Sequence, residues 1–321
     1  MRIVPGAADF GASAARPSAA RLAVAIGNFD GVHLGHAALL AEARARAARR
    51  GAASAVLTFT PHPARLFAPE RAPPLIMSLE RRLELVAEAG IDVAIVQPFT
   101  RDFAAIDAPA FVRDVLARDL GACDAVVGYD FSFGRGRAGN AGMLGALGAA
   151  ADIEVAVIPP ISVAGQACSS TRIRELVQAG DTDAAAGLLG RPFELEGVVV
   201  RGAGRGRGLG FSTANVAPEA ELRPLLGIYA ARARVLDGPL AGTARAAALS
   251  VGRNPTFDAG AGPGNAVSVE AYLLDFEGDL YDRRLRLEVG DRLRDEQRFD
   301  SIEALIAQIR EDVTRVRKLF S

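Results

Sequence analysis

The stretch GNFDGVHLGH, Gly27–His36, decides the fold of the first half of the chain. It follows the short apolar run Leu22–Gly27 and precedes Ala37–Arg50, whose composition is helical, so it predicts a strand, a turn and a helix in that order. Glycines at 27, 31 and 35 let the backbone approach a ligand closely. We expect the helix to begin near His36 and to aim its free amide groups and the positive end of its dipole at one point.

Two imidazoles, His33 and His36, stand at that helix start. Phosphoryl and nucleotidyl transfer need positioning and donors aimed at developing charge, and this turn offers amides, a dipole and two imidazoles. A glycine-rich turn with incidental histidines is the simpler alternative, but the chain has 3 histidines and two of them lie here. A metal pair is a further alternative, although no cysteine and no obvious third ligand is near. The turn therefore predicts nucleotide chemistry.

Strand-like and helix-like segments alternate up to about residue 187. Strands separated by helices predict a mostly parallel sheet that binds ligands at the carboxyl ends of its strands. The expected strands are Leu22–Gly27, Ala53–Phe59, Val93–Val96, Ala125–Gly128 and Glu154–Ile158. The expected helices are Ala37–Arg50, Leu79–Ala89 and Pro109–Leu120.

The second half has a different pattern. Two short helices, Ser170–Ala179 and Thr182–Leu189, lead into strand-like segments joined by Gly-, Pro- and Asp-rich turns. These segments predict an antiparallel sheet or small barrel, and a helix from about Ser301 to Leu319 closes the chain. The expected strands are Leu195–Val200, Ile228–Leu236, Ala244–Val251, Val267–Leu274 and Leu285–Val289. We predict two domains, residues 1–187 and 188–321.

Composition agrees with two globular domains. The chain has 321 residues, of which 50% are hydrophobic and 23% charged, which excludes a disordered chain. The 37 Lys and Arg residues balance 38 Asp and Glu residues, which argues against a general nucleic-acid or anionic-membrane binder. Two distant cysteines, the lack of a signal-like N-terminus and the lack of an 18-residue apolar run predict a cytoplasmic protein without a membrane span.

Two further segments offer phosphate ligands. In the first, Ser169–Thr171 supply hydroxyls at a helix start, and Arg172 and Arg174 can fork onto phosphate oxygens. An ordinary capped surface helix is the alternative for this segment.

The second segment is RGAGRGRGLGFSTANV, Arg201–Val216. We interpret it as a phosphate-covering loop followed by Thr213 and Asn215, whose oxygens could hold Mg²⁺ on one side of a strand. An RG-rich nucleic-acid segment and a functionless glycine hairpin are the alternatives.

These motifs resemble a known family. GNFDGVHLGH resembles the HxGH signature of nucleotidyltransferases and, more narrowly, the adenylyltransferase half of bacterial bifunctional riboflavin kinase/FMN adenylyltransferases, also called FAD synthetases. The segments TFTPHP, VVGYDFSFGRGRAGN and SSTRIRELVQAGD are similar to further motifs of that half. In the second half, GFSTAN resembles the kinase signature G-x-P-T-A-N, with Ser212 in place of the proline, and VSVEAYLLDFEGDLY and LRDEQRF also resemble kinase segments.

The resemblance implies a Rossmann-like nucleotidyltransferase domain with a parallel sheet, followed by an antiparallel β-barrel with a terminal helix. The barrel would phosphorylate riboflavin to FMN, and the first domain would adenylylate FMN to FAD. ATP is the implied co-substrate, and riboflavin, FMN and FAD are substrates or products. The implied catalytic residues are His33, His36 and Glu270, and the implied Mg²⁺ ligands are Thr213 and Asn215.

The resemblance also implies binding residues for each ligand. Those for ATP in adenylyl transfer are Gly27, Asn28, Phe29, Asp30, Gly31, Gly35, Asp130, Ser169, Ser170, Thr171, Arg172 and Arg174. Those for ATP in the kinase are Gly204, Arg205, Gly206, Arg207 and Gly210. Those for flavin are His62, Arg294, Glu296 and Arg298.

Two other functions stay open at this point. One is an adenylyltransferase whose kinase half is weakened by Ser212, and the other is a non-catalytic flavin-binding protein. The expected partners are small molecules, without nucleic acid or membrane, and a weak homo-oligomer is left open.

Overall fold

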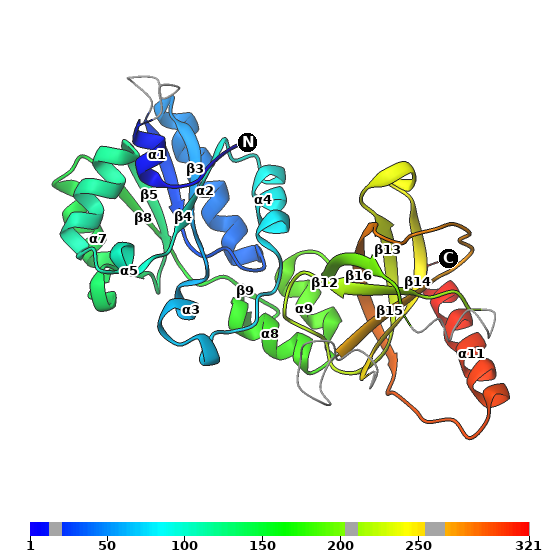
Figure 1. Ribbon diagram of the computed structural model, residues 1–321. Helices are drawn as coiled ribbons and strands as arrows, with labels where there is room; N and C mark the ends of the chain where they lie inside the picture. The colour runs from blue at the N-terminus through cyan, green and yellow to red at the C-terminus, as the bar shows by residue number, and fades with distance from the viewer. Residues whose placement is uncertain (13–20, 203–210, 254–266, 321) are drawn as a thin grey trace. The chain divides into compact units, whose positions relative to one another are not determined.

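The computed structural model describes residues 1–12, 21–202, 211–253 and 267–320, which form two compact units (Figure 1). The first unit comprises Met1–Pro73 and Leu79–Cys168, and the second comprises Pro74–Ser78 and Ser169–Ser321. Helices α8 (Ser170–Gln178) and α9 (Thr182–Leu189) group with the second unit, because α8 packs on α9 and α9 packs on two strands of that unit. This division differs from the domain boundary after residue 187, which stays a prediction.

The first unit is built on a six-stranded sheet in which every neighbouring pair of strands is parallel. This confirms the predicted sheet type. Across the sheet the strands are β1 (Arg2–Val4), β4 (Val93–Pro98), β3 (Ala53–Thr60), β2 (Leu22–Ile26), β5 (Ala122–Gly128) and β8 (Glu154–Ile158). The edge strand β1 and the helix α1 (Ala7–Ala12) were not predicted, since both are too short to show a period.

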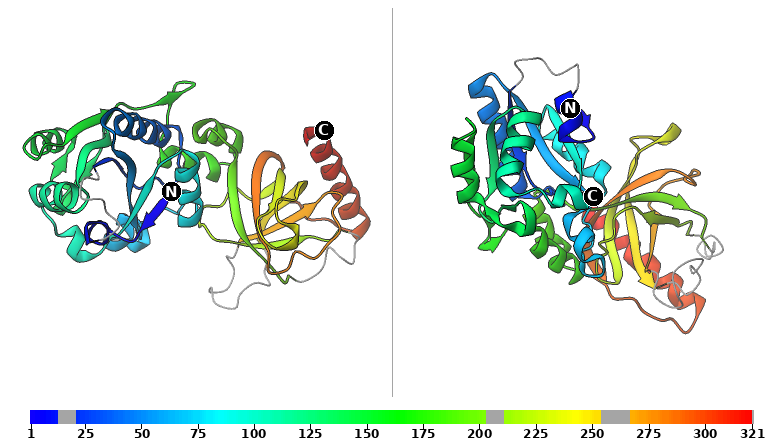
Figure 2. Two further views of the ribbon diagram at one scale, coloured as in Figure 1. Left: turned by 90° about the horizontal axis from the view of Figure 1, so that it is seen from above. Right: turned by 60° about the vertical axis from the view of Figure 1, so that its left-hand side comes forward.

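Helices cover both faces of this sheet, as two views in Figure 2 show. On β2, Leu22, Val24 and Ile26 belong to a core that includes Phe10 of α1 and Val112. The alternate residues of the strand face α2 (Leu34–Arg50), since successive side chains of a strand point to opposite faces. The other helices of this unit are α3 (Pro63–Phe67), α4 (Leu79–Glu88), α5 (Arg101–Ala104), α6 (Ala108–Ala110), the π-helix η2 (Phe111–Asp119) and α7 (Ala141–Ala149).

Helix α2 begins earlier than predicted. Its first residue is Leu34, and His33 is the cap, because the His33 Nδ1 accepts the backbone N–H of His36 at 3.3 Å. The helix therefore begins two residues before His36, close to the predicted start. The sequence hides this start because an imidazole occupies the position that Ser, Thr, Asp or Asn usually takes.

The second unit contains a closed antiparallel barrel with a terminal helix, which confirms the predicted architecture. Around the barrel the strands are β11 (Phe193–Val200), β12 (Ala214–Pro218), β15 (Val267–Leu273), β14 (Ala244–Arg253), β13 (Gly227–Val235) and β16 (Arg284–Arg294). Helix α11 (Ile302–Phe320) packs on β14 and β13, and Ser301 caps it by accepting the Ala304 N–H at 3.1 Å. No helix in the described ranges is both long and apolar enough to cross a membrane.

Alternation along the barrel strands separates a core from a polar outer face. On β12, Ala214 and Val216 are buried, whereas Asn215 between them is half-buried. On β15, Val269 and Ala271 are buried on either side of Glu270. Asn215 and Glu270 therefore lie on the outside of the barrel.

Candidate active sites

Three loops of the first unit meet at the carboxyl edge of its sheet. The turn after β2 is tied to β3, because Gly27 donates its N–H to the Leu57 carbonyl at 3.1 Å and the Thr58 hydroxyl donates to the Asn28 carbonyl at 3.1 Å. The Asn28 amide also lies 3.3 Å from Nε2 of His62, which follows β3. The strand order changes direction between β2 and β5, and ligands of such sheets bind at this switch point.

The two histidines of the turn are stacked. Their ring centroids lie 3.7 Å apart with 18° between the ring planes, and the Phe29 ring lies 5.1 Å from that of His36. Because Nδ1 of His33 accepts a backbone N–H, the proton of the neutral ring is on Nε2, which makes that atom a donor. The predicted pair is thus one stacked pair at the start of α2.

Gly35 leaves space for this pair. A Cβ atom at Gly35 would lie 3.0 Å from two atoms of the His33 ring and 3.4 Å from the carbonyl oxygen of Cys168. Any larger residue would therefore press on the His33 imidazole. Cys168 is also the last residue of the first unit, so the chain leaves this unit beside the histidine turn.

The turn between β2 and α2 is strained. Phe29 and Val32 have φ values of 52° and 37°, and Gly31 has 92°. A positive φ is costly for a bulky or β-branched residue and persists only where the surroundings enforce it. Asp30, in the middle of this turn, is 1% exposed, so its carboxylate points into the protein.

The loop after β5 lies at the same sheet edge. Asp130 follows the strand end by two residues and is exposed, next to Tyr129, which is 57% exposed. The segment then forms a hairpin of β6 (Ser132–Phe133) and β7 (Gly139–Asn140). A Cβ atom at Gly139 would lie 2.6 Å from the Phe133 ring, so this tight hairpin needs glycine there.

The predicted Ser169–Arg174 segment is the start of α8 in the second unit. Ser169 caps the helix by accepting the Arg172 N–H at 3.2 Å, and Ser170 and Thr171 form its first turn. The Arg172 guanidinium is on the surface, 3.0 Å from Glu175. Arg174 is 8% exposed and donates to the Pro74 carbonyl at 2.7 Å. Four of the five predicted residues, Ser169–Arg172, are therefore at least partly exposed, while Arg174 is held within the unit.

On the outer face of the barrel, the structure brings the predicted kinase residues together. Asn215 on β12 and Ser250 on β14 both lie directly opposite Glu270 on β15. The Thr213 hydroxyl, just before β12, donates to the Glu270 carboxylate at 3.4 Å. Among the described residues no group of three or more His, Cys, Asp or Glu could hold a metal ion. The donors here are a hydroxyl, an amide oxygen and one carboxylate, which suits a hard cation bound partly by phosphates.

Two glycines leave space for polar side chains on this outer face. A Cβ atom at Gly202 would lie 2.3 Å from the Asn215 amide, and a Cβ atom at Gly252 would contact the Glu296 carboxylate. Gly252 and Ser250 lie on the same side of β14, so Glu296 is near the row that contains Glu270. The structure thus joins the loop before α11 to the predicted kinase site.

The other predicted flavin residues have different surroundings. Arg294 makes a fork onto Asp312 of α11, with N–O distances of 2.8, 3.0 and 3.1 Å, and its guanidinium lies 5.9 Å from the Phe299 ring. Arg298 is exposed on the loop before α11. Five predicted ATP residues of the kinase lie outside the described residues: Gly204, Arg205, Gly206, Arg207 and Gly210.

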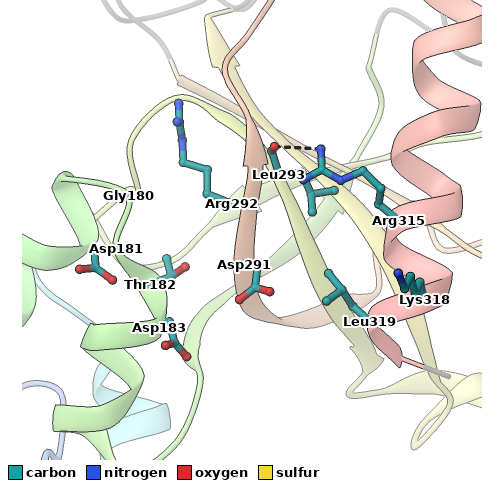
Figure 3. A pocket seen from close by; sticks show the side chains of 10 residues that line it. All are labelled: Gly180, Asp181, Thr182, Asp183, Asp291, Arg292, Leu293, Arg315, Lys318 and Leu319. Atoms are coloured by element: carbon teal, nitrogen blue, oxygen red, sulfur yellow. Dashed lines mark hydrogen bonds between the residues drawn. The ribbon is translucent and has the colours of Figure 1, made fainter.

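A cavity of about 630 Å³ lies elsewhere in the second unit (Figure 3). Figure 3 shows Asp181 and Asp183 on one side and Arg315 and Lys318 on the other. The Thr182 hydroxyl donates to the Gly290 carbonyl at 2.6 Å and Arg315 to the Leu293 carbonyl at 3.0 Å, so these polar groups attach α9 and α11 to β16. None of the predicted site residues lines this cavity.

Sequence reasoning missed one aromatic side chain near the flavin-side histidine. Phe67, at the end of α3, is 70% exposed, and its ring lies edge-on to Phe99, which in turn contacts Phe59. His62 caps the same helix by accepting the Ala64 N–H at 3.2 Å. An aromatic residue five positions after a capping histidine was the available signal, but its exposure is visible only in the structure.

Known proteins match both halves of the chain. A family model described as FAD synthetase matches residues 15–172, and one described as riboflavin kinase matches residues 189–320. The bifunctional riboflavin kinase/FMN adenylyltransferase of Pseudomonas fluorescens is 38% identical over 304 residues, 95% of this chain and 94% of the relative. The Escherichia coli (strain K12) protein of the same description is 36% identical, over 92% of this chain and 91% of its own.

A solved structure has the same fold over its whole length. It is described as a macrolide-efflux protein from Streptococcus pneumoniae, has a TM-score of 0.84 and is 28% identical, with 99% of each chain covered. The two family matches and the near-complete coverage of the relatives agree with the two units and their motifs. The chain belongs to the family of bifunctional riboflavin kinase/FMN adenylyltransferases.

Proposed function

We propose that this chain makes FMN from riboflavin and ATP in its second unit and FAD from FMN and ATP in its first. The observation that carries the proposal is that each matched range contains an assembled group of residues suited to one of these reactions. The stacked His33 and His36 lie within the range matched to FAD synthetase, and the row of Thr213, Asn215 and Glu270 lies within the range matched to riboflavin kinase.

In the kinase reaction, Glu270 is the general base. Its carboxylate takes the proton of the riboflavin 5′-hydroxyl, the oxygen forms a bond to the γ-phosphorus of ATP, and the bond to the β-phosphate oxygen breaks to release ADP. The Thr213 hydroxyl, which donates to this carboxylate at 3.4 Å, supports this role. Asn215 and Ser250 lie directly across the strands from Glu270, so the base is on a polar part of the outer face.

Thr213 and Asn215 are the residues that would hold Mg²⁺. Their hydroxyl and amide oxygens are hard donors next to a carboxylate, and Gly202 leaves room for the Asn215 side chain. When bound, the ion neutralises phosphate charge. We expect the predicted glycine-rich segment before Thr213 to contact the phosphates.

In the adenylyl transfer, the site acts by positioning the substrates and by supplying hydrogen-bond donors. An oxygen of the FMN phosphate forms a bond to the α-phosphorus of ATP, and pyrophosphate leaves. The Nε2–H of His33 and the first amides of α2 are donors for the charge that develops on the leaving group. Arg172 and the hydroxyls of Ser169–Thr171 are expected to contact phosphate, whereas Arg174, bound to the Pro74 carbonyl, supports the segment.

Flavin binding is expected at an aromatic surface in the first unit and near α11 in the second. Phe67 offers an exposed ring face beside the loop of His62, and a planar flavin ring can stack on it. In the second unit, Glu296 and Arg298 lie on the loop before α11, which is joined to β14 at Gly252.

We expect the enzyme to work in the cytoplasm, and a weak homo-oligomer stays a prediction.

One assay separates the proposal from its alternatives. The protein is incubated with riboflavin, Mg²⁺ and ATP, and the flavins are resolved by chromatography. FAD as the product supports both activities. Conversion of supplied FMN without conversion of riboflavin leaves an adenylyltransferase with a weakened kinase, and no conversion of either leaves a flavin-binding protein.

Variants assign each reaction to its unit. Glu270→Gln should abolish FMN formation and keep the conversion of FMN to FAD, and His36→Ala should do the reverse. Glu277→Gln is the matched control, because Glu277 is an exposed glutamate after the same strand. Loss of both reactions in either variant, or loss of one in the control, would contradict the assignment.

A further inference from the structure

The structure contains a buried arginine that the proposed reaction does not yet use. Arg82, on α4, is 4% exposed, and its Nη2 lies 4.0 Å from Oδ1 of the buried Asp30. Its Nε is also buried and has no hydrogen-bond partner among the described residues. Burial lowers the pKa of the Arg82 guanidinium from its ordinary value, while the Asp30 and Glu80 carboxylates oppose that shift.

The neighbouring arginine shows what an ordinary buried arginine looks like in this helix. Arg81 is 5% exposed, yet it is paired with Glu84 at 3.0 Å and Glu88 at 3.1 Å on its own helix. Arg82 has no such partner on α4 among the described ion pairs, and its nearest carboxylate is on a different segment, 52 positions earlier in the chain. A buried charge of this kind destabilises the folded protein unless an opposite charge or a hydrogen bond compensates for the lost water.

The opposite charge, Asp30, lies in the strained turn between β2 and α2. Asp30 stands between Phe29 and Val32, whose backbones have positive φ, and the turn leads directly into the His33 cap of α2. Strain of this sort relaxes unless the surroundings oppose it. A carboxylate drawn inward by a buried cation opposes it at the centre of the turn.

We propose that Arg82 is a positioning residue for adenylyl transfer: by holding the Asp30 carboxylate it keeps the 29–32 turn in its strained form and so fixes the stacked imidazoles of His33 and His36. Arg82 acts through Asp30 and the backbone, and it does not contact the substrates. This inference rests on the proposed function of the first unit.

The test compares three single substitutions on α4 and one double variant that also changes the turn, all in the full-length chain. Arg82→Met removes the charge and keeps an unbranched apolar side chain, and Arg82→Lys keeps the charge. Arg81→Met is the matched control, since it removes a neighbouring buried arginine of the same helix. The double variant Asp30→Asn/Arg82→Met removes both charges, so that no buried carboxylate is left without its Arg82 counterpart if the single variant folds poorly.

Steady-state kinetics provide the first measurement. Arg82→Met should lower kcat for FMN adenylylation by about 10–100-fold, as expected for misplaced reacting groups, with little change in KM for ATP. Arg82→Lys should restore most of the rate, and Arg81→Met should keep it. Riboflavin phosphorylation by the same proteins should stay at the wild-type rate. Wild-type kcat in Arg82→Met, or a rise in KM alone, would overturn the inference.

Nuclear magnetic resonance of the imidazoles provides a measurement that does not depend on turnover. The chain has 3 histidines, so their ring signals can be assigned from single substitutions. The His33 and His36 signals should move in Arg82→Met and in the double variant, and should stay in Arg81→Met. Unchanged signals would overturn the inference even if the enzyme is active. If the wild-type protein made no FAD while the His33 and His36 signals still moved in Arg82→Met, that result would contradict the proposed function alone.

Discussion

The Arg294–Asp312 fork allows a quantitative prediction for the barrel unit. The side chains are 13% and 4% exposed, and three N–O distances between them lie from 2.8 to 3.1 Å. The pair joins the end of β16 to α11, which covers β14 and β13. Asp312→Asn leaves the shape nearly unchanged and removes the charge, so Arg294 would stay buried without its counterion.

The structure sets the size of the effect. Breaking a buried pair by removing one partner costs about 3–5 kcal/mol. For a unit of this size each kcal/mol lowers the melting temperature by about 2–4 °C, so the transition of the second unit should fall by about 6–20 °C. Calorimetry of the whole chain measures this, and the transition of the first unit should stay in place.

Two controls make the result interpretable. Asp275→Asn breaks a fork to Arg317, which is also on α11, but that pair is solvent-exposed. The melting temperature of the second unit should therefore hardly change in this variant. The double variant Arg294→Met/Asp312→Leu leaves no lone charge and should recover most of the lost stability. The reasoning fails if Asp312→Asn melts like Asp275→Asn, or if the double variant is no more stable than Asp312→Asn.

Three further predictions concern the two sites. Gly35→Ala should press on the His33 ring and lower FMN adenylylation at least about tenfold with unchanged kinase activity; equal rates in a flavin chromatography assay would count against the packing argument. Phe67→Ala should raise KM for FMN about tenfold at most through lost stacking, and Phe67→Tyr should restore it; an unchanged KM excludes the ring as a flavin platform. Ser212→Pro should leave the kinase rate equal or higher, because proline fixes a backbone dihedral angle of the loop; a strong drop in riboflavin phosphorylation would show that the loop depends on Ser212.

The sequence predicted the fold where the local pattern was strong. The apolar run before Gly27 and the helical composition after His36 predicted β2 and α2, and the change in pattern near residue 187 predicted the barrel. The sequence predicted an extended strand at Thr213 and Asn215 but not the bounds of β12, which begins after Thr213 and includes the polar Asn215 and Pro218. Tertiary pairing on both sides makes this strand, and single-sequence patterns do not contain that information.

The sequence predicted which residues belong to the site, but not which of them lie next to each other in the fold. Thr213, Asn215 and Glu270 were predicted from their motifs, yet the register that sets Asn215 opposite Glu270 joins positions 55 apart. Arg82 was not predicted at all, since an arginine on an amphipathic helix reads as a solvent-facing residue. Its burial and its distance from Asp30 depend on how α4 packs, which composition does not reveal.

The closed barrel has a consequence for the rigidity of the proposed kinase residues. Strand β12 is hydrogen-bonded to β11 on one side and to β15 on the other, so the backbone beside Glu270 has no free edge. Amide protons in such a strand exchange with solvent only when a large part of the structure opens. We therefore expect slow deuterium uptake along β12 and β15, which means that the backbone carrying the proposed base is already ordered before substrates arrive.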